Sequence, residues 1–158
     1  MTLGLLVSTT ADVAIEWSFL AGLGLFLVAH VVYVAAFLDG RSPLRLLRAL
    51  PVLAAIGVAY RLIASGLGPL RGAVVLYMAA IGTMVWRAAA RVGCRGPARP
   101  AERSALLGAV LFAASDTLIA LDRFHAPIPG ARYAIILVYW AGQLGIALSA
   151  QVARQADS

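Results

Sequence analysis

Six apolar segments, separated by short breaks rich in Gly, Pro and Arg, account for nearly all of this 158-residue chain. They cover residues 3–17, 18–38, 46–65, 69–90, 104–121 and 132–152. A transmembrane helix needs about 20 apolar residues, with a range of about 17–25. All segments except the first meet this length when flanking residues are included. We therefore predict an all-α, polytopic transmembrane bundle of about six helices.

The composition supports a membrane protein rather than a soluble domain. Hydrophobic residues make up 62% of the chain and charged residues 13%, whereas a soluble domain has roughly 45–50% apolar residues. We expect one transmembrane helical domain over residues 1–158. The single cysteine, Cys94, allows no intrachain disulfide and no cysteine-based metal site.

The basic residues are all arginines, and they stand at the ends of the apolar segments rather than along one face. This distribution argues against a nucleic-acid-binding surface, despite the net charge of +6. One predicted side carries Arg41, Arg45, Arg48, Arg87, Arg91, Arg95, Arg99, Arg103 and Arg154, and the other carries Arg61, Arg71, Arg123 and Arg132. Because basic residues are enriched in cytoplasmic loops, this bias predicts that both termini lie in the cytoplasm.

Two aspartates, Asp12 and Asp116, lie inside predicted membrane-spanning segments. A carboxylate in hydrocarbon costs at least a few kcal/mol, so an intramembrane acid indicates a functional site. Both residues lie five or six positions before the predicted ends of their helices, which places them at a similar depth. Asp12 can alternatively be a hydrated interfacial residue next to Glu16, whereas Asp116 has apolar flanks on both sides.

Other polar residues fall on the predicted helices at depths that can bring them to the same pocket. We expect them to bind substrate: Ser8, His30, Tyr33, Tyr77, Ser115, Tyr139 and Gln143. Tyr139 and Gln143 are one helical turn apart and so share a face. The alternative is that these side chains only join helices by hydrogen bonds, each contributing about 1 kcal/mol. Gly22, Gly24, Gly82, Gly108, Gly142 and Gly145 are expected to allow close helix packing.

Two carboxyl groups in one pocket can divide the roles of general acid and general base. A weaker alternative is a zinc site in which Asp12, Asp116 and His30 are three ligands. No spacing motif such as His-Glu-x-x-His supports that alternative, and we expect neither a metal nor a cofactor.

The segments around the two aspartates also resemble each other. Thr-Ala-Asp-Val-Ala-Ile at 10–15 is similar to Ala-Ser-Asp-Thr-Leu-Ile at 114–119, and a helix with a mid-helix His30 or Gln143 follows each. This pattern is typical of a parallel repeat of a two-helix unit, although chance similarity between Ala-rich helices explains it equally well.

The order of these motifs resembles that of the lysoplasmalogenase family of YhhN-like membrane proteins. The family's Ser-x-x-Gly-Asp motif appears at 8–12 with Ala in place of Gly, and its His-x-x-Tyr motif appears as His30 and Tyr33. Tyr77 is followed by Met78, the Phe-x-x-Ser-Asp motif occupies 112–116, and the last helix carries Tyr139 and Gln143. Family members usually have two more helices before the first of these motifs, so we expect this chain to lack them.

The resemblance implies a bacterial inner-membrane enzyme that hydrolyses the vinyl ether bond of lysoplasmalogens, which are lysophospholipids of the bilayer. Such a reaction needs an acid that protonates carbon and a carboxylate that stabilises the resulting cation. We assign Asp116 as the acid and Asp12 as the base, and the reverse assignment stays open. The remaining polar side chains would hold water or the glycerol head group. The competing hypotheses are a small proton-coupled transporter, active as a homodimer, and a non-catalytic membrane protein.

Overall fold

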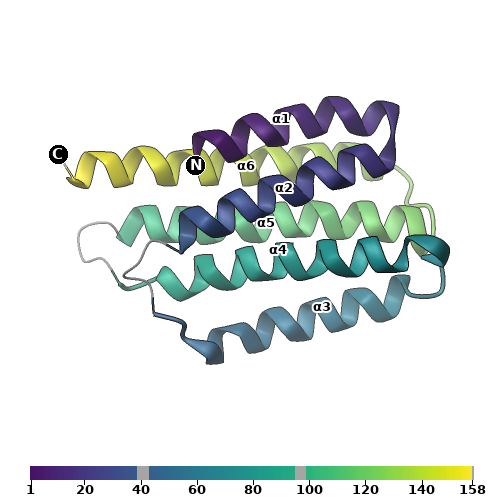
Figure 1. The fold of residues 1–158 in the computed structure, drawn as a ribbon, viewed down its shortest axis with the longest axis horizontal. Helices are drawn as coiled ribbons and strands as arrows, with labels where there is room; N and C mark the ends of the chain where they lie inside the picture. Colours follow the sequence, from purple (N-terminus) through teal and green to yellow (C-terminus); the bar gives the residue numbers. More distant parts are fainter. Residues whose placement is uncertain (39–42, 95–98, 158) are drawn as a thin grey trace.

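The computed structural model describes residues 1–38, 43–94 and 99–157, and the side chains of 1–38, 43–94 and 100–151. Helices make up this part of the chain, and they run side by side along its long axis (Figure 1). The α-helices are α1 (Thr2–Trp17), α2 (Phe19–Phe37), α3 (Leu50–Ile63), α4 (Arg71–Arg91), α5 (Arg99–Phe124) and α6 (Ala131–Asp157). Two 3₁₀ helices, η1 (Leu46–Ala49) and η2 (Gly68–Leu70), lead into α3 and α4. The predicted all-α bundle is confirmed.

Five helical segments in the described part of the chain are long and apolar enough to cross a membrane: Phe19–Phe37, Leu46–Ile63, Gly68–Arg91, Pro100–Phe124 and Ala131–Gln151. They correspond to the last five predicted segments. Helix α1 has 16 residues, as expected from the short first segment. Helix α5 begins at Arg99, five residues before the predicted segment, because the amphipathic stretch before Ser104 continues its helical turns.

The ends of the helices follow local sequence signals. The side chain of Ser18, whose backbone is extended, accepts a hydrogen bond from the backbone N–H of Ala21 and so caps α2. Pro51 lies in the first turn of α3, where a missing N–H matters least. Gly68 and Gly130 adopt positive φ angles of 47° and 76° in the turns before α4 and α6, a conformation that favours glycine.

The most extensive helix contact is between α5 and α6, and glycine makes it possible. A Cβ atom on Gly108 would lie 2.7 Å from the carbonyl oxygen of Gly142 and 2.7 Å from the backbone nitrogen of Ile146. A Cβ atom on Gly145 would lie 2.9 Å from the Cα atom of Gly108. Gly22 and Gly82 also face close neighbours, as predicted, but Gly24 has open space around it. The prediction for Gly24 is therefore wrong, because no other helix in the described part of the chain packs against that position of α2.

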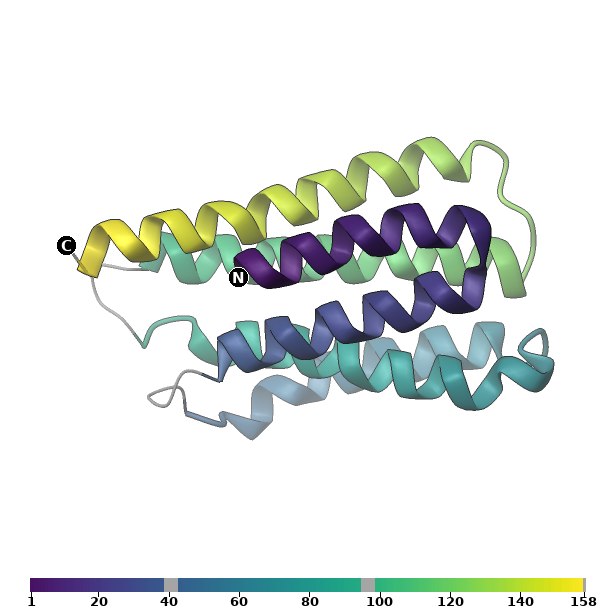
Figure 2. The ribbon, with the colours of Figure 1, turned by 45° about the horizontal axis from the view of Figure 1, so that its top comes forward.

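Helix α3 is the most exposed of the bundle. It lies at the margin opposite α1 and α6 in both ribbon views (Figures 1 and 2). Ile63, at its end, is its buried residue, whereas Leu53 and Val58 are more than 60% exposed. Apolar side chains with that exposure suit contact with lipid tails.

The C-terminal ends of α2, α4 and α6 lie at one end of the bundle (Figure 1). There Arg45 and Arg48 donate hydrogen bonds to Val92 and Ala89 carbonyl oxygens at the end of α4. The arginines at 41, 95, 99 and 154, which contribute to the predicted orientation, have side chains outside the described residues. The cytoplasmic placement of the termini stays a prediction.

Candidate functional site

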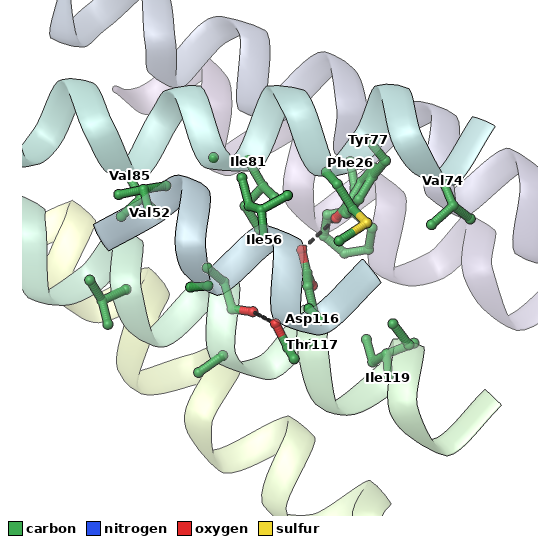
Figure 3. Close-up of a pocket in the computed structure, with 18 of the residues that line it drawn as sticks. Phe26, Val52, Ile56, Val74, Tyr77, Ile81, Val85, Asp116, Thr117 and Ile119 are labelled. Carbon is green, nitrogen blue, oxygen red and sulfur yellow. Dashed lines mark hydrogen bonds between the residues drawn. The ribbon is translucent and has the colours of Figure 1, made fainter. Parts of the chain in front are cut away.

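A cavity of about 580 Å³ runs between α2, α3, α4 and α5. This volume is within the range of about 300–1,000 Å³ that is usual for small-molecule sites. Most of its walls are apolar, and Figure 3 shows Asp116, Tyr77 and Thr117 among aliphatic and aromatic side chains. Exposed residues on its wall include Pro51 and Ala55 on α3 and Val110 and Ala114 on α5. The cavity therefore opens sideways, between α3 and α5, toward the region that lipid would occupy.

Asp116 is held on the cavity wall by α4 and α2. The Tyr77 hydroxyl donates a hydrogen bond of 2.5 Å to Oδ2 of Asp116 (Figure 3). Nε2 of His30 lies 3.8 Å from the same oxygen. The Asp116 side chain is 12% exposed, whereas His30 is fully buried. Because both protein contacts are made to Oδ2, the other carboxyl oxygen has no protein partner in the described part of the chain.

His30 lies behind Asp116 with its ring orientation fixed. Its Nδ1 is 2.6 Å from the carbonyl oxygen of Phe26. A carbonyl oxygen can only accept, so Nδ1 carries a hydrogen. In the neutral ring Nε2 therefore carries the lone pair, and it makes no hydrogen bond within the described residues. The imidazole presents this nitrogen to the Asp116 carboxyl group.

Asp12 belongs to a second network, built from α1, α2 and α6. The Tyr139 hydroxyl donates to Oδ2 of Asp12 at 2.8 Å, and Nε2 of Gln143 donates to the Tyr139 oxygen at 2.8 Å. The Tyr33 hydroxyl donates to Oε1 of Gln143 at 3.0 Å, and Ser8 lies 3.4 Å from the Tyr33 oxygen. Every donor in this chain of bonds points toward Asp12, so the network ends on an acceptor. This arrangement suits an ionised carboxylate.

A layer of aromatic rings separates the two networks. The Phe112 ring centroid lies 4.9 Å from that of His30 and 5.2 Å from that of Tyr139, both edge to face. Phe26 makes similar contacts with Phe112 and Tyr139. Phe26 also lines the cavity, whereas Asp12 is not among the lining residues. We expected one pocket lined by both carboxyl groups. This cavity is lined by Asp116 and not by Asp12.

Each aspartate has one partner on a helix of the other predicted repeat unit, and Asp116 has a second partner, Tyr77, on α4, which belongs to neither unit. Helix α1 packs on α2, and α5 packs on α6. Asp12 on α1 nevertheless binds Tyr139 on α6, whereas Asp116 on α5 faces His30 on α2.

The predicted site residues thus fall into three groups. Asp116, Tyr77 and His30 form the cavity-side cluster, and Ser8, Asp12, Tyr33, Tyr139 and Gln143 form the second network. Ser115 joins neither, because its hydroxyl donates to the Ile135 carbonyl oxygen on α6. Among the described residues no three His, Cys, Asp or Glu side chains converge, so Asp12, Asp116 and His30 do not form the three-ligand set considered above.

Three residues of the site were not predicted from the sequence. Phe26 and Phe112 form the ring layer, and Thr117 lines the cavity next to Asp116 while donating to the Ala113 carbonyl oxygen (Figure 3). Phe112 belongs to the Phe-x-x-Ser-Asp motif, one turn before Asp116, so its spacing was an available signal. Phe26 precedes His30 by one turn in the same way.

The apolar helices and the polar clusters buried between them define a polytopic integral membrane protein. Residues 1–150 match the YhhN family, and the chain belongs to that family. No solved protein structure gives a significant match to the chain.

Curated relatives are lysoplasmalogenases from mammals. Lysoplasmalogenase TMEM86A of Bos taurus is 39% identical over 158 aligned residues, which cover 96% of this chain and 65% of the bovine protein. Lysoplasmalogenase TMEM86A of Homo sapiens is 37% identical with the same coverage. Lysoplasmalogenase TMEM86B of Homo sapiens is 36% identical over 152 residues. The chain thus spans just under two thirds of the length of the relatives it matches.

Proposed function

We propose that this protein is a membrane-embedded hydrolase that cleaves the vinyl ether bond of lysoplasmalogen-type lysolipids. The observation that carries the proposal is the carboxyl group of Asp116 on the wall of an apolar cavity that opens sideways. A lysolipid has one hydrocarbon chain, and a cavity of this size and lining suits such a chain. The names of the mammalian relatives support the same substrate class.

The proposed reaction begins with proton transfer from Asp116 to carbon. The proton adds to the vinyl carbon that does not carry oxygen, and the electron pair of the double bond forms the new C–H bond. The positive charge is then shared between the other carbon and the ether oxygen. Water adds to that carbon and returns a proton to Asp116. The hemiacetal collapses to a fatty aldehyde and releases the glycerol hydroxyl of the glycerophospho-amine.

The neighbours of Asp116 are placed to support the carboxylate left by this transfer. Tyr77 donates to Oδ2 in both protonation states of the acid. Nε2 of His30 lies 3.8 Å from the same oxygen. Hydrogen-bond donors positioned before the reaction are an efficient way to stabilise developing charge in a dry site.

Asp12 acts in this proposal as an electrostatic partner across the ring layer rather than as a group that touches substrate. Its negative charge, held by the Tyr139 hydroxyl, favours the cation formed in the cavity. The aromatic rings between the networks are apolar, so they screen that charge less than water does. We also expect the predicted orientation, with both termini in the cytoplasm of a bacterial cell.

The proposal is tested by incubating the purified protein with single-chain lipids that differ only in their linkage. We expect fatty aldehyde from the vinyl ether lysolipid, and neither aldehyde nor fatty acid from the saturated ether or the ester. Release of fatty acid from the ester, or uptake into vesicles with no turnover of any lipid, would replace the proposal by an esterase or a transporter.

Replacing Asp12 by Asn should slow aldehyde release about tenfold, which corresponds to about 1.4 kcal/mol of lost transition-state stabilisation. The amide oxygen can still accept from Tyr139, so the network survives while the charge is lost. The measurement is kcat with the vinyl ether lysolipid in detergent. The control is Glu16→Gln, one turn away and exposed, for which we expect no change. An Asp12→Asn protein as fast as the wild type would remove Asp12 from the mechanism.

A further inference from the structure

One arginine lies at the end of the cavity, on the face of α5 that carries Asp116. The guanidinium carbon of Arg123 is 3.9 Å from the ring centroid of Phe19 and 5.9 Å from that of Phe124. The two rings pack edge to face with their centroids 6.0 Å apart. Both rings line the cavity. Phe19 and Phe124 therefore form part of the cavity wall, and the charge of Arg123 lies against their rings.

The spacing from Asp116 to Arg123 is the same as that from Phe26 to Phe19. Each pair is separated by seven residues, which is about two helical turns, or about 10.5 Å along the axis. Phe26 lies beside Asp116 in the cavity (Figure 3), and Phe19 lies beneath Arg123. The two antiparallel helices thus place Arg123 about two turns from Asp116 on the same side of the cavity.

The guanidinium group of Arg123 is available to a ligand. Arg123 is exposed, and no carboxylate pairs with it in the described part of the chain. Among the described residues, Arg71 and Arg132, at the same end of the bundle, have no comparable contact with the rings that line the cavity. Arg71 donates to the Ala64 carbonyl oxygen in the α3–α4 connection, and Arg132 lies on exposed α6 away from the lining residues. A planar guanidinium with free donors matches the geometry of a phosphodiester.

We propose that Arg123 binds the phosphodiester of the single-chain lipid whose tail occupies the cavity, and so sets the depth at which the reacting bond meets Asp116. This inference rests on the proposed function for the identity of the lipid. It assigns the head group to the part of the cavity walled by Phe19 and Phe124, and the tail to the opposite part, toward Val52 and Val85 (Figure 3). Head-group recognition is then separate from the acid that performs the chemistry.

Binding of two ligands that cannot be hydrolysed tests this assignment without any need for turnover. The probes are a saturated 1-alkyl lysophosphatidylcholine and the 1-alkylglycerol of the same chain length. Affinities are measured by calorimetry in a detergent that contains no phosphate, which excludes phosphate from surrounding lipids. We expect the wild type to bind the phosphate-containing probe more tightly. Arg123→Gln should weaken that binding about tenfold and leave alkylglycerol binding within twofold, and Arg123→Lys should fall between.

Arg132→Gln is the matched control, because it removes an exposed arginine at the same end of the bundle, and it should change neither affinity. Melting temperatures show whether each variant is folded. Equal losses for both probes, or no loss for the phosphate-containing probe, would overturn the assignment of Arg123. Failure of the wild type to bind either probe would overturn the proposed function as well. Selective phosphate binding without any aldehyde release would overturn the proposed function and leave the phosphate site standing.

Discussion

Asp116→Asn should reduce aldehyde release from a vinyl ether lysolipid by about 10²–10⁴-fold, the usual contribution of a positioned general acid. Asn has nearly the shape of Asp, and its amide oxygen can still accept the hydrogen bond from Tyr77. The proton that must reach carbon is the only chemical feature removed. The measurement is kcat at saturating lipid, because the change affects the chemical step rather than the fit of the tail.

The matched control for this variant is Thr117→Val, which alters the neighbouring polar group on the cavity wall. The Thr117 hydroxyl donates to Ala113 within its own helix, so its loss should change kcat less than threefold. The melting temperature of Asp116→Asn should equal or exceed that of the wild type, because a buried ionisable group is replaced by a neutral one. An Asp116→Asn protein that melts normally and retains the wild-type kcat would remove Asp116 as the acid.

Gly108→Leu should prevent α5 and α6 from packing and should yield little or no folded protein. Even the first side-chain carbon would lie 2.7 Å from backbone atoms of Gly142 and Ile146. Backbone atoms cannot swing aside as a flexible side chain can, so the helices must separate. Overpacking commonly costs about 1–3 kcal/mol, and we expect the milder Gly108→Ala to fall in that range. Thermal unfolding in detergent measures the effect.

Gly57 on α3 provides the comparison, because an added Cβ atom there meets no other atom within 4 Å. Gly57→Ala should leave the melting temperature unchanged or raise it, since Ala is the better helix former by roughly 0.8–1.0 kcal/mol. If Gly108→Ala and Gly57→Ala change the melting temperature by the same amount, the close contact between α5 and α6 does not stabilise the protein.

The fold could be predicted because the bilayer imposes a simple length rule on apolar segments. The Pro and Gly residues between the apolar segments indicated where the helices are connected. The last five predicted segments match the candidate membrane spans in the structure. The start of α5 at Arg99 was missed, because a charged, amphipathic extension of a membrane helix has no strong apolar signal. The packing role of Gly24 was also predicted wrongly, because the sequence does not indicate which face of a helix packs against a neighbouring helix.

The residues of the candidate site could be predicted from the sequence, but their division into two separate networks could not. Single polar residues in apolar helices stand out, so Asp12, Asp116, His30 and the tyrosines were found without a structure. Helical spacing predicted that Tyr139 and Gln143 share a face, and they are hydrogen-bonded. The sequence could not show which helices are neighbours. The ring layer of Phe26 and Phe112, which keeps Asp12 off the cavity that Asp116 lines, follows only from the packing.

The central claim is that a carboxyl group fixed on the cavity wall protonates the vinyl ether carbon. It is tested most directly by running the reaction in D₂O, reducing the aldehyde as it forms and locating the deuterium on the carbon next to the former carbonyl. The Asp116 carboxyl proton exchanges with solvent, and it approaches the bound chain from one side. The account predicts one deuterium per product, on a single face of that carbon. Product without deuterium, or with deuterium equally distributed between both faces, would contradict protonation by a fixed acid.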